Sequence, residues 1–105
     1  MNGRFLFHED RFVAIDKPPG VLVIPGRTGP ADACLRAHVE AALGAKVFVV
    51  HRLDQDTSGV VLFARDAATH RTLSMAFEHG EVKKRYLARV HGRVEQDLTI
   101  DAALV

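Results

Sequence analysis

The 105-residue sequence has no tryptophan, one tyrosine and one cysteine, and it has no long apolar run. The single cysteine, Cys34, excludes a disulfide within the chain and fits a reducing compartment. A membrane helix needs about 20 consecutive apolar residues, and acids interrupt the first ten residues too early for a signal peptide. We therefore expect a soluble cytoplasmic protein with no membrane partner.

An excess of charge of one sign is also missing. Fourteen basic and thirteen acidic residues leave a formal net charge of +1, so any case for a nucleic-acid partner depends on local clustering. Hydrophobic residues make up 48% of the chain and charged residues 26%, which is typical of a folded domain. This length predicts one domain with one modest core.

Hydrophobic spacing predicts several strands. Short apolar runs at residues 5–7 and 12–15, separated by a polar turn, favour an antiparallel pair. Residues 21–24 favour a further extended segment. Residues 82–90 alternate as a strand does and carry many cations.

The same spacing predicts two helices, and hence an α+β fold with a mixed, mostly antiparallel sheet. Helical spacing begins at Ala31, with Asp32 in the first turn and Gly44 as the C-terminal cap. A second helix follows Asp66, a residue that favours the N-cap position, and ends at Gly80.

The central stretch of the chain is residues 47–64. Val47–Val50 and Val60–Ala64 are short apolar runs rich in β-branched residues, which predicts strands buried on both faces. A compact polar segment joins them. Rigid strands on either side fix the position of such a loop, so we expect the chemistry of the protein there.

Two carboxylates in this loop, Asp54 and Asp56, suit a nucleophile, a general base or a metal ligand. The simpler alternative is that they cap the turn through hydrogen bonds to nearby amides. A calcium loop is excluded because its twelfth position is Arg65, where a glutamate is required. An aspartyl-phosphate enzyme also places two aspartates after a strand, but that match is short.

Other sites are less well supported. Zinc binding by Cys34, His38 and His51 competes with core packing, which the apolar helix face favours. Ser58 with His51 lacks the sequence around a nucleophilic serine. The cations near the end of the chain are either a solvated edge strand or, with Tyr86 among them, a surface for RNA phosphates and stacked bases.

His51–Ala64 resembles the signature of the RluA-type RNA pseudouridine synthases, His-Arg-Leu-Asp-x-x-Thr-Ser-Gly followed by aliphatic residues and Ala. Asp16–Val21 resembles the family's upstream Lys-Pro-x-Gly segment. Val82–Gly92 resembles its downstream Lys-x-Tyr-x-Ala-x-Val-x-Gly strand. The three segments occur in the family's order, and the resemblance covers nearly the whole chain.

The resemblance implies a role for each matching residue. Asp54 corresponds to the catalytic aspartate, which acts on uridine without metal or cofactor, either by attack at C1′ or by removal of the 2′ proton. Tyr86 corresponds to the tyrosine that stacks on the target base, and Arg52 to a residue that holds the RNA open. We expect phosphate contacts from Lys83, Lys84 and Arg85, and loop shaping by His51, Thr57, Ser58 and Gly59.

Members of this family are longer and continue to an arginine that pairs with the catalytic aspartate. We therefore expect residues 1–105 to be the N-terminal part of a pseudouridine synthase catalytic domain acting on rRNA or tRNA. An incomplete sheet also predicts self-association through its edge. The alternative is a non-catalytic RNA-binding or protein-interaction module.

Overall fold

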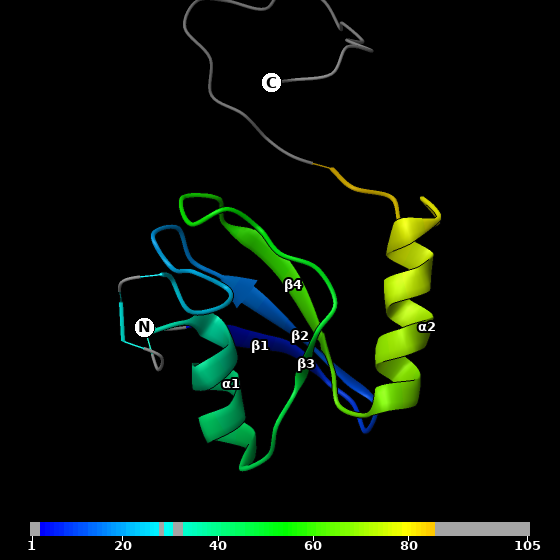
Figure 1. Ribbon diagram of the computed structural model, residues 1–105, viewed down its shortest axis with the longest axis horizontal. Helices are drawn as coiled ribbons and strands as arrows, with labels where there is room; N and C mark the ends of the chain where they lie inside the picture. The colour runs from blue at the N-terminus through cyan, green and yellow to red at the C-terminus, as the bar shows by residue number, and fades with distance from the viewer. Residues whose placement is uncertain (1–2, 28, 31–32, 86–105) are drawn as a thin grey trace, which may run out of the picture.

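The computed structural model describes residues 3–27, 29–30 and 33–85. These residues form four strands and two helices (Figure 1). In chain order the elements are β1 Arg4–His8, β2 Phe12–Lys17, α1 Leu35–Leu43, β3 Phe48–Val49, β4 Gly59–Ala64 and α2 Ala67–Glu78. No helix in the described part of the chain is long and apolar enough to cross a membrane.

The four strands form one sheet in the order β1-β2-β4-β3, and each of these pairings is antiparallel. The predicted pairing of residues 5–7 with 12–15 is confirmed as β1 and β2. The central strands β2 and β4 pair from Phe12 opposite Ala64 to Lys17 opposite Gly59. Two helices with an antiparallel sheet confirm the predicted α+β class, and the described strands show no parallel pairing.

The core lies on the face of the sheet that α1 covers. Val13 and Ile15 of β2 lie opposite Phe63 and Val61 of β4, and all four side chains are fully buried. Alternate residues of a strand point to the same face, so these four form one apolar layer. The helix α1 adds Leu35 and Val39 to the layer, both fully buried.

Helix α1 begins at Leu35, so the prediction of a start at Ala31 is wrong. The amide of Leu35 donates to the carbonyl of Leu22 at 2.7 Å, and the next amide donates to the carbonyl of Val23 at 3.0 Å. These carbonyls satisfy donors that a helix leaves unpaired at its N-terminus. Asp32 therefore precedes the helix and lies outside the described residues.

The other predicted helix ends agree with the structure. Gly44 has φ 68° and its amide donates to Glu40, which closes the last turn of α1. The carboxylate of Asp66 accepts from the amide of Thr69 at 2.7 Å and from its hydroxyl at 3.0 Å. The backbone hydrogen bond from Thr69 is the largest cause of the lowered pKa of Asp66. Gly80 follows α2 with φ 69°.

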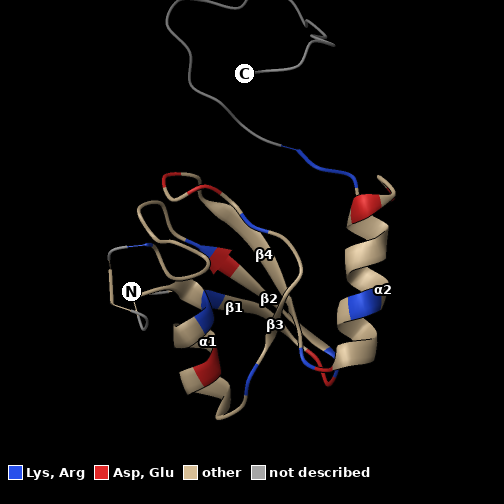
Figure 2. Ribbon diagram, in the orientation of Figure 1, with Lys and Arg blue, Asp and Glu red and all other residues tan. Residues whose placement is uncertain are grey.

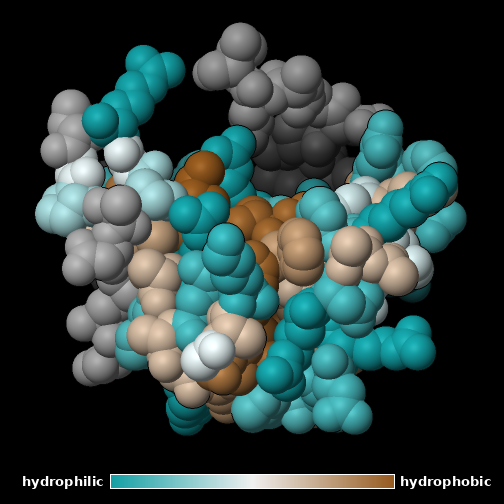
Figure 3. Space-filling view, turned by 60° about the horizontal axis from the view of Figure 1, so that its bottom comes forward, coloured by the Kyte–Doolittle hydropathy of each residue, from teal (hydrophilic) through white to brown (hydrophobic). Residues whose placement is uncertain are grey.

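The prediction of strands buried on both faces is wrong. β3 is a two-residue edge strand, Phe48 is 38% exposed, and Val60 of β4 is 53% exposed. Apolar residues therefore reach the surface, and Figure 3 shows apolar residues between hydrophilic neighbours on one face. A short apolar run does not reveal whether one face or both faces are covered.

Two predicted extended segments are not strands. Residues 21–24 form no strand, although Val23 is 2% exposed and joins the core. Residues 82–85 form none either, and the rest of the predicted strand at 82–90 lies outside the described residues. Core packing of a bent segment and strand formation produce similar apolar patterns in the sequence.

Candidate functional site: a braced loop beside a basic cavity

The polar loop between β3 and β4 contains a tight turn. The carbonyl of Asp54 accepts from the amide of Thr57 at 3.0 Å, so backbone groups close this turn. Asp54 and Asp56 are both exposed. In the described part of the chain, neither carboxylate accepts a hydrogen bond from the turn amides. The capping role weighed for the two carboxylates is therefore not what holds the turn.

Lys17 braces this turn from the end of β2. Its side chain is 0% exposed, and it continues the inward-facing row of Val13 and Ile15. The Nζ atom donates to the carbonyls of Val21 at 2.7 Å, Gln55 at 2.9 Å and Pro18 at 3.0 Å. An ammonium group has three N–H donors, and all three are used. These three hydrogen bonds, the Lys17 brace, therefore join β2, the following loop and the turn that carries the carboxylates.

Gly20 adds a second link between these two loops. Its amide donates to the carbonyl of Gln55 at 2.8 Å, and its carbonyl accepts from the side chain of Gln55 at 3.4 Å. Gly20 has φ 87°, a conformation that favours glycine. Burial lowers the pKa of Lys17, while the charge of Asp56 opposes that shift. Desolvation is thus the stronger effect on this lysine.

His51 holds the start of the loop. Its Nε2 atom accepts from the amide of Leu62 in β4 at 3.0 Å. Its ring stacks on Phe77 of α2, with ring centroids 4.4 Å apart and planes 15° apart. Burial lowers the pKa of His51, and the nearby charge of Lys84 lowers it further. The side chain of His51 therefore connects the loop to β4 and to α2.

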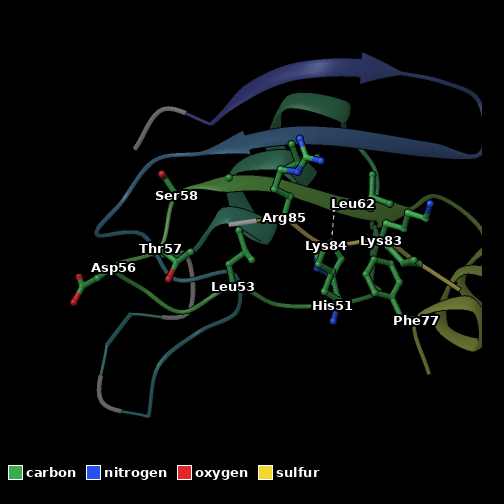
Figure 4. Close-up of a pocket in the computed structure, with 13 residues that line it drawn as sticks. His51, Leu53, Asp56, Thr57, Ser58, Leu62, Phe77, Lys83, Lys84 and Arg85 are labelled. Atoms are coloured by element: carbon green, nitrogen blue, oxygen red, sulfur yellow. Dashed lines mark hydrogen bonds between the residues drawn. The ribbon is translucent and has the colours of Figure 1, made fainter. Parts of the chain in front are cut away.

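A cavity of about 670 Å³ lies beside the loop. At one end Figure 4 shows Asp56, Thr57 and Ser58, and at the other His51 and Phe77 with the basic residues. The lining is mixed, with hydroxyl, apolar and charged groups: His51, Leu53, Asp56, Thr57, Ser58, Gly59, Val60, Leu62, Phe77, Val82, Lys83, Lys84 and Arg85. A mixed cavity of this size suits a ligand with an apolar part and a charged part.

The charges of the cavity are mostly positive. Lys83, Lys84 and Arg85 follow α2, and Figure 2 shows this basic segment toward the same end of the molecule as the acidic loop before β4. The Nζ atom of Lys84 lies 5.6 Å from the centre of the Phe77 ring, within reach of a cation–π interaction. Asp56 is the one carboxylate among the described lining residues.

Seven of the predicted site residues line the cavity, and two others do not. The seven that line the cavity are His51, Thr57, Ser58, Gly59, Lys83, Lys84 and Arg85. Asp54 and Arg52 are exposed on the same loop and do not line the cavity. Tyr86 lies outside the described residues, so its distance from Asp54 stays untested.

Phe77 and Lys17 were not predicted as site residues from the sequence, and Asp56 was weighed beside Asp54 as a reacting carboxylate or metal ligand without being chosen. Phe77 fell only within the helix expected between Asp66 and Gly80, and Lys17 only within the segment that resembles the family's Lys-Pro-x-Gly. Phe77 and Lys17 act through contacts with residues far away in the chain. The signal for Lys17 was a lysine at the end of an apolar strand, where burial demands partners.

No group of three histidine, cysteine, aspartate or glutamate side chains in the described part of the chain could hold a metal ion. Cys34 is fully buried beside the first turn of α1, and His38 is partly exposed one helical turn later. The full burial of Cys34 agrees with the core packing that the apolar helix face favours.

Comparisons with known proteins identify the family of the chain. A family profile described as RNA pseudouridylate synthase matches residues 11–105. The chain is 38% identical over 104 residues to an uncharacterized RNA pseudouridine synthase, YjbO, of Bacillus subtilis, covering 94% of this chain and 37% of that protein. It is 37% identical over 100 residues to tRNA pseudouridine synthase C of Haemophilus ducreyi, covering 94% of this chain and 41% of that protein.

A third relative is the dual-specificity RNA pseudouridine synthase RluA of Vibrio vulnificus, 35% identical over 92 residues, which cover 88% of this chain and 36% of that protein. The chain thus spans about two fifths or less of these relatives. Among solved structures, human RNA pseudouridylate synthase domain containing 4 matches with a TM-score of 0.58 and 26% identity, over 73% of this chain and 30% of that one. The chain belongs to the RNA pseudouridylate synthase family.

Proposed function

We propose that residues 1–105 form part of the catalytic domain of an RNA pseudouridine synthase, and that the protein isomerises uridine to pseudouridine in structured rRNA or tRNA. The observation that carries the proposal is the Lys17 brace, which fixes the loop bearing Asp54 beside a cavity lined by three cations. Names of relatives that specify tRNA or dual specificity support RNA as the substrate.

The proposed chemistry requires a uridine that has left its helix. Unstacking a base costs a few kcal/mol, and the apolar side chains of Leu53, Leu62 and Phe77 offer surface for the base. Cations hold phosphates without reading the sequence, which is the role we propose for Lys83, Lys84 and Arg85. Their clustering supports RNA contact over a merely solvated surface.

The reacting group in this proposal is the carboxylate of Asp54. It either attacks C1′ or removes the 2′ proton, and the bond from C1′ to N1 of uracil breaks. After the base rotates, a bond forms from C1′ to C5; in the first route the bond from C1′ to the carboxylate breaks as this happens, and in the second route C2′ regains its proton. C5 then loses its proton and N1 gains one. The net reaction is an isomerisation, so it consumes no cofactor. A carboxylate suits both routes, because it stabilises positive charge at C1′ or accepts a proton.

The test is pseudouridine formation in transcripts of structured rRNA and tRNA, measured by mass spectrometry of the digested RNA. Pseudouridine at defined positions supports the proposal. Salt-sensitive RNA binding with no pseudouridine in any transcript would instead favour the non-catalytic module. A cytoplasmic location is part of the proposal, and self-association through the exposed edge strand β1, where Phe7 is 62% exposed, stays a prediction.

The basic segment predicts a measurable salt dependence. Replacing both Lys83 and Lys84 with alanine is expected to weaken RNA binding and to reduce the slope of log K against log salt by about 2, because each phosphate contact contributes about one unit. Binding measured between 50 and 200 mM salt gives this slope. The matched control replaces Lys46 and Arg71, both exposed outside the cavity. Equal slopes in the two double variants would contradict the assignment.

A further inference from the structure

The side chain of His51 joins three elements at the cavity. His51 is the second residue of the loop that carries Asp54; its ring accepts a hydrogen bond from the amide of Leu62 in β4 and stacks on Phe77 of α2. Figure 4 shows the hydrogen bond from Leu62 to this ring, with Phe77 beside it. Only two residues separate His51 from Asp54 along the chain, so a movement of the ring is passed to the turn through a short segment.

The hydrogen bond defines the charge state of the ring. The amide of Leu62 can only donate, so Nε2 must carry a lone pair and the proton of the neutral ring must be on Nδ1. Adding a proton to Nε2 would make two N–H groups face each other at 3.0 Å. The contact that holds the loop therefore exists only with neutral imidazole.

We propose that His51 is a positioning residue for the reaction at Asp54, active only as the neutral Nδ1-H tautomer, and that protonation of its ring releases the loop from β4. The inference rests on the proposed function and adds a pH-dependent control to the same site. His51 does not touch the reacting atoms in this scheme. It acts by holding the segment that leads to the carboxylate.

The charges around the ring oppose its protonation. Lys83, Lys84 and Arg85 face the cavity from the segment after α2, and Asp56 faces it from the loop. The elements β4 and α2 contribute Gly59, Val60, Leu62 and Phe77 to the lining, and none of these titrates. The face of Phe77 would attract an imidazolium, but Lys84 already lies over that ring. Burial and Lys84 hold the pKa of His51 below its ordinary value of 6.5.

The sign of the pH effect follows from this lowered pKa. An unfolded chain binds a proton at His51 near pH 6.5, while the folded chain resists it to a lower pH. Stability therefore falls as the pH drops below about 6.5 and stops falling below the folded pKa. The contribution of His51 is fully present above pH 6.5.

Nuclear magnetic resonance of the chain tests the geometry without any activity assay. The ring nitrogen shifts of His51 are expected to show the Nδ1-H tautomer and a pKa below 6.5, and the Leu62 amide is expected to move with the same midpoint. Exchange of that amide with solvent should accelerate below the midpoint. An Nε2-H tautomer would overturn the proposal even if the enzyme is active. So would a Leu62 amide resonance that does not shift as the His51 ring is protonated.

Turnover tests the link to function. In the unaltered protein, kcat is expected to fall about tenfold for each pH unit below the midpoint measured for the ring, as for any single essential base. The glutamine of His51→Gln has an amide oxygen that accepts a hydrogen bond but takes up no proton. In this variant the fall in kcat at low pH, the low-pH limb of the profile, is expected to vanish. The measure is the ratio of rates at two pH values within each variant, so a loss of absolute rate does not affect it.

The control is His8→Gln, which changes an exposed histidine of β1 outside the cavity. It is expected to retain the low-pH limb of the unaltered protein. The same limb in His51→Gln would overturn the proposal. If no variant forms pseudouridine, the proposed function fails, and the resonance experiment alone decides whether His51 positions the loop.

Discussion

Asp54→Asn is expected to reduce pseudouridine formation by at least about 10³-fold, because an amide neither attacks C1′ nor accepts a proton as a carboxylate does. The fold should survive this change. The turn at this position is closed by the backbone carbonyl of Asp54, which asparagine retains. RNA binding should also stay nearly intact, since the proposed phosphate contacts come from other residues. Single-turnover assays and binding measurements on the same RNA separate the two effects.

Asp56→Asn is the matched control for that variant. Asp56 lies two residues further along the same exposed loop, and it lines the cavity, whereas Asp54 does not. Its substitution is expected to alter turnover by about tenfold or less, because it contributes charge near Lys17 and does not react. Loss of turnover in Asp56→Asn with activity retained in Asp54→Asn would show that Asp56, and not Asp54, is the reacting carboxylate. Equal loss of RNA binding and turnover in Asp54→Asn would also count against the proposed role.

The parts of the fold that the sequence predicts correctly are determined by local groups. Asp66 caps α2 through Thr69, three residues away, and Gly44 ends α1 in a left-handed conformation. Both depend on the chemistry of residues within one turn. The start of α1 could not be predicted this way. Its first amide donates to Leu22, and only the folded chain brings this carbonyl to the helix.

The residues of the site show the same contrast between local and long-range contacts. Its loop was predicted because polar residues interrupt two apolar runs, and seven of its predicted residues do line one cavity. Phe77 and Lys17 were missed as site residues because their contacts cross 26 and 38 positions, from His51 to Phe77 and from Lys17 to Gln55. Residue types do not encode such distances. Lys17 is buried at the end of β2, but the sequence pattern does not show which groups accept its hydrogen bonds.

Lys17→Met is expected to lower the free energy of unfolding by about 2–3 kcal/mol. Methionine fills similar space but removes three hydrogen bonds from a charged donor, and relief of the cost of burying that charge offsets part of the loss. Turnover is expected to fall about 100-fold even under conditions where the variant is fully folded, because a carboxylate displaced by about 1 Å loses that much rate. Urea titration measures the first effect, and turnover at low temperature measures the second.

Lys46→Met is the control, since Lys46 is exposed before β3 and the same exchange there should change stability by about 0.5 kcal/mol or less. The amide resonances of Gln55 and Thr57 distinguish positioning from simple destabilisation. A brace that positions the turn predicts that they shift in folded Lys17→Met and stay in place in Lys46→Met. Full turnover per folded molecule in Lys17→Met would show that the three hydrogen bonds stabilise the fold alone. The carboxylate would then keep its place through the backbone turn and the contacts of Gly20.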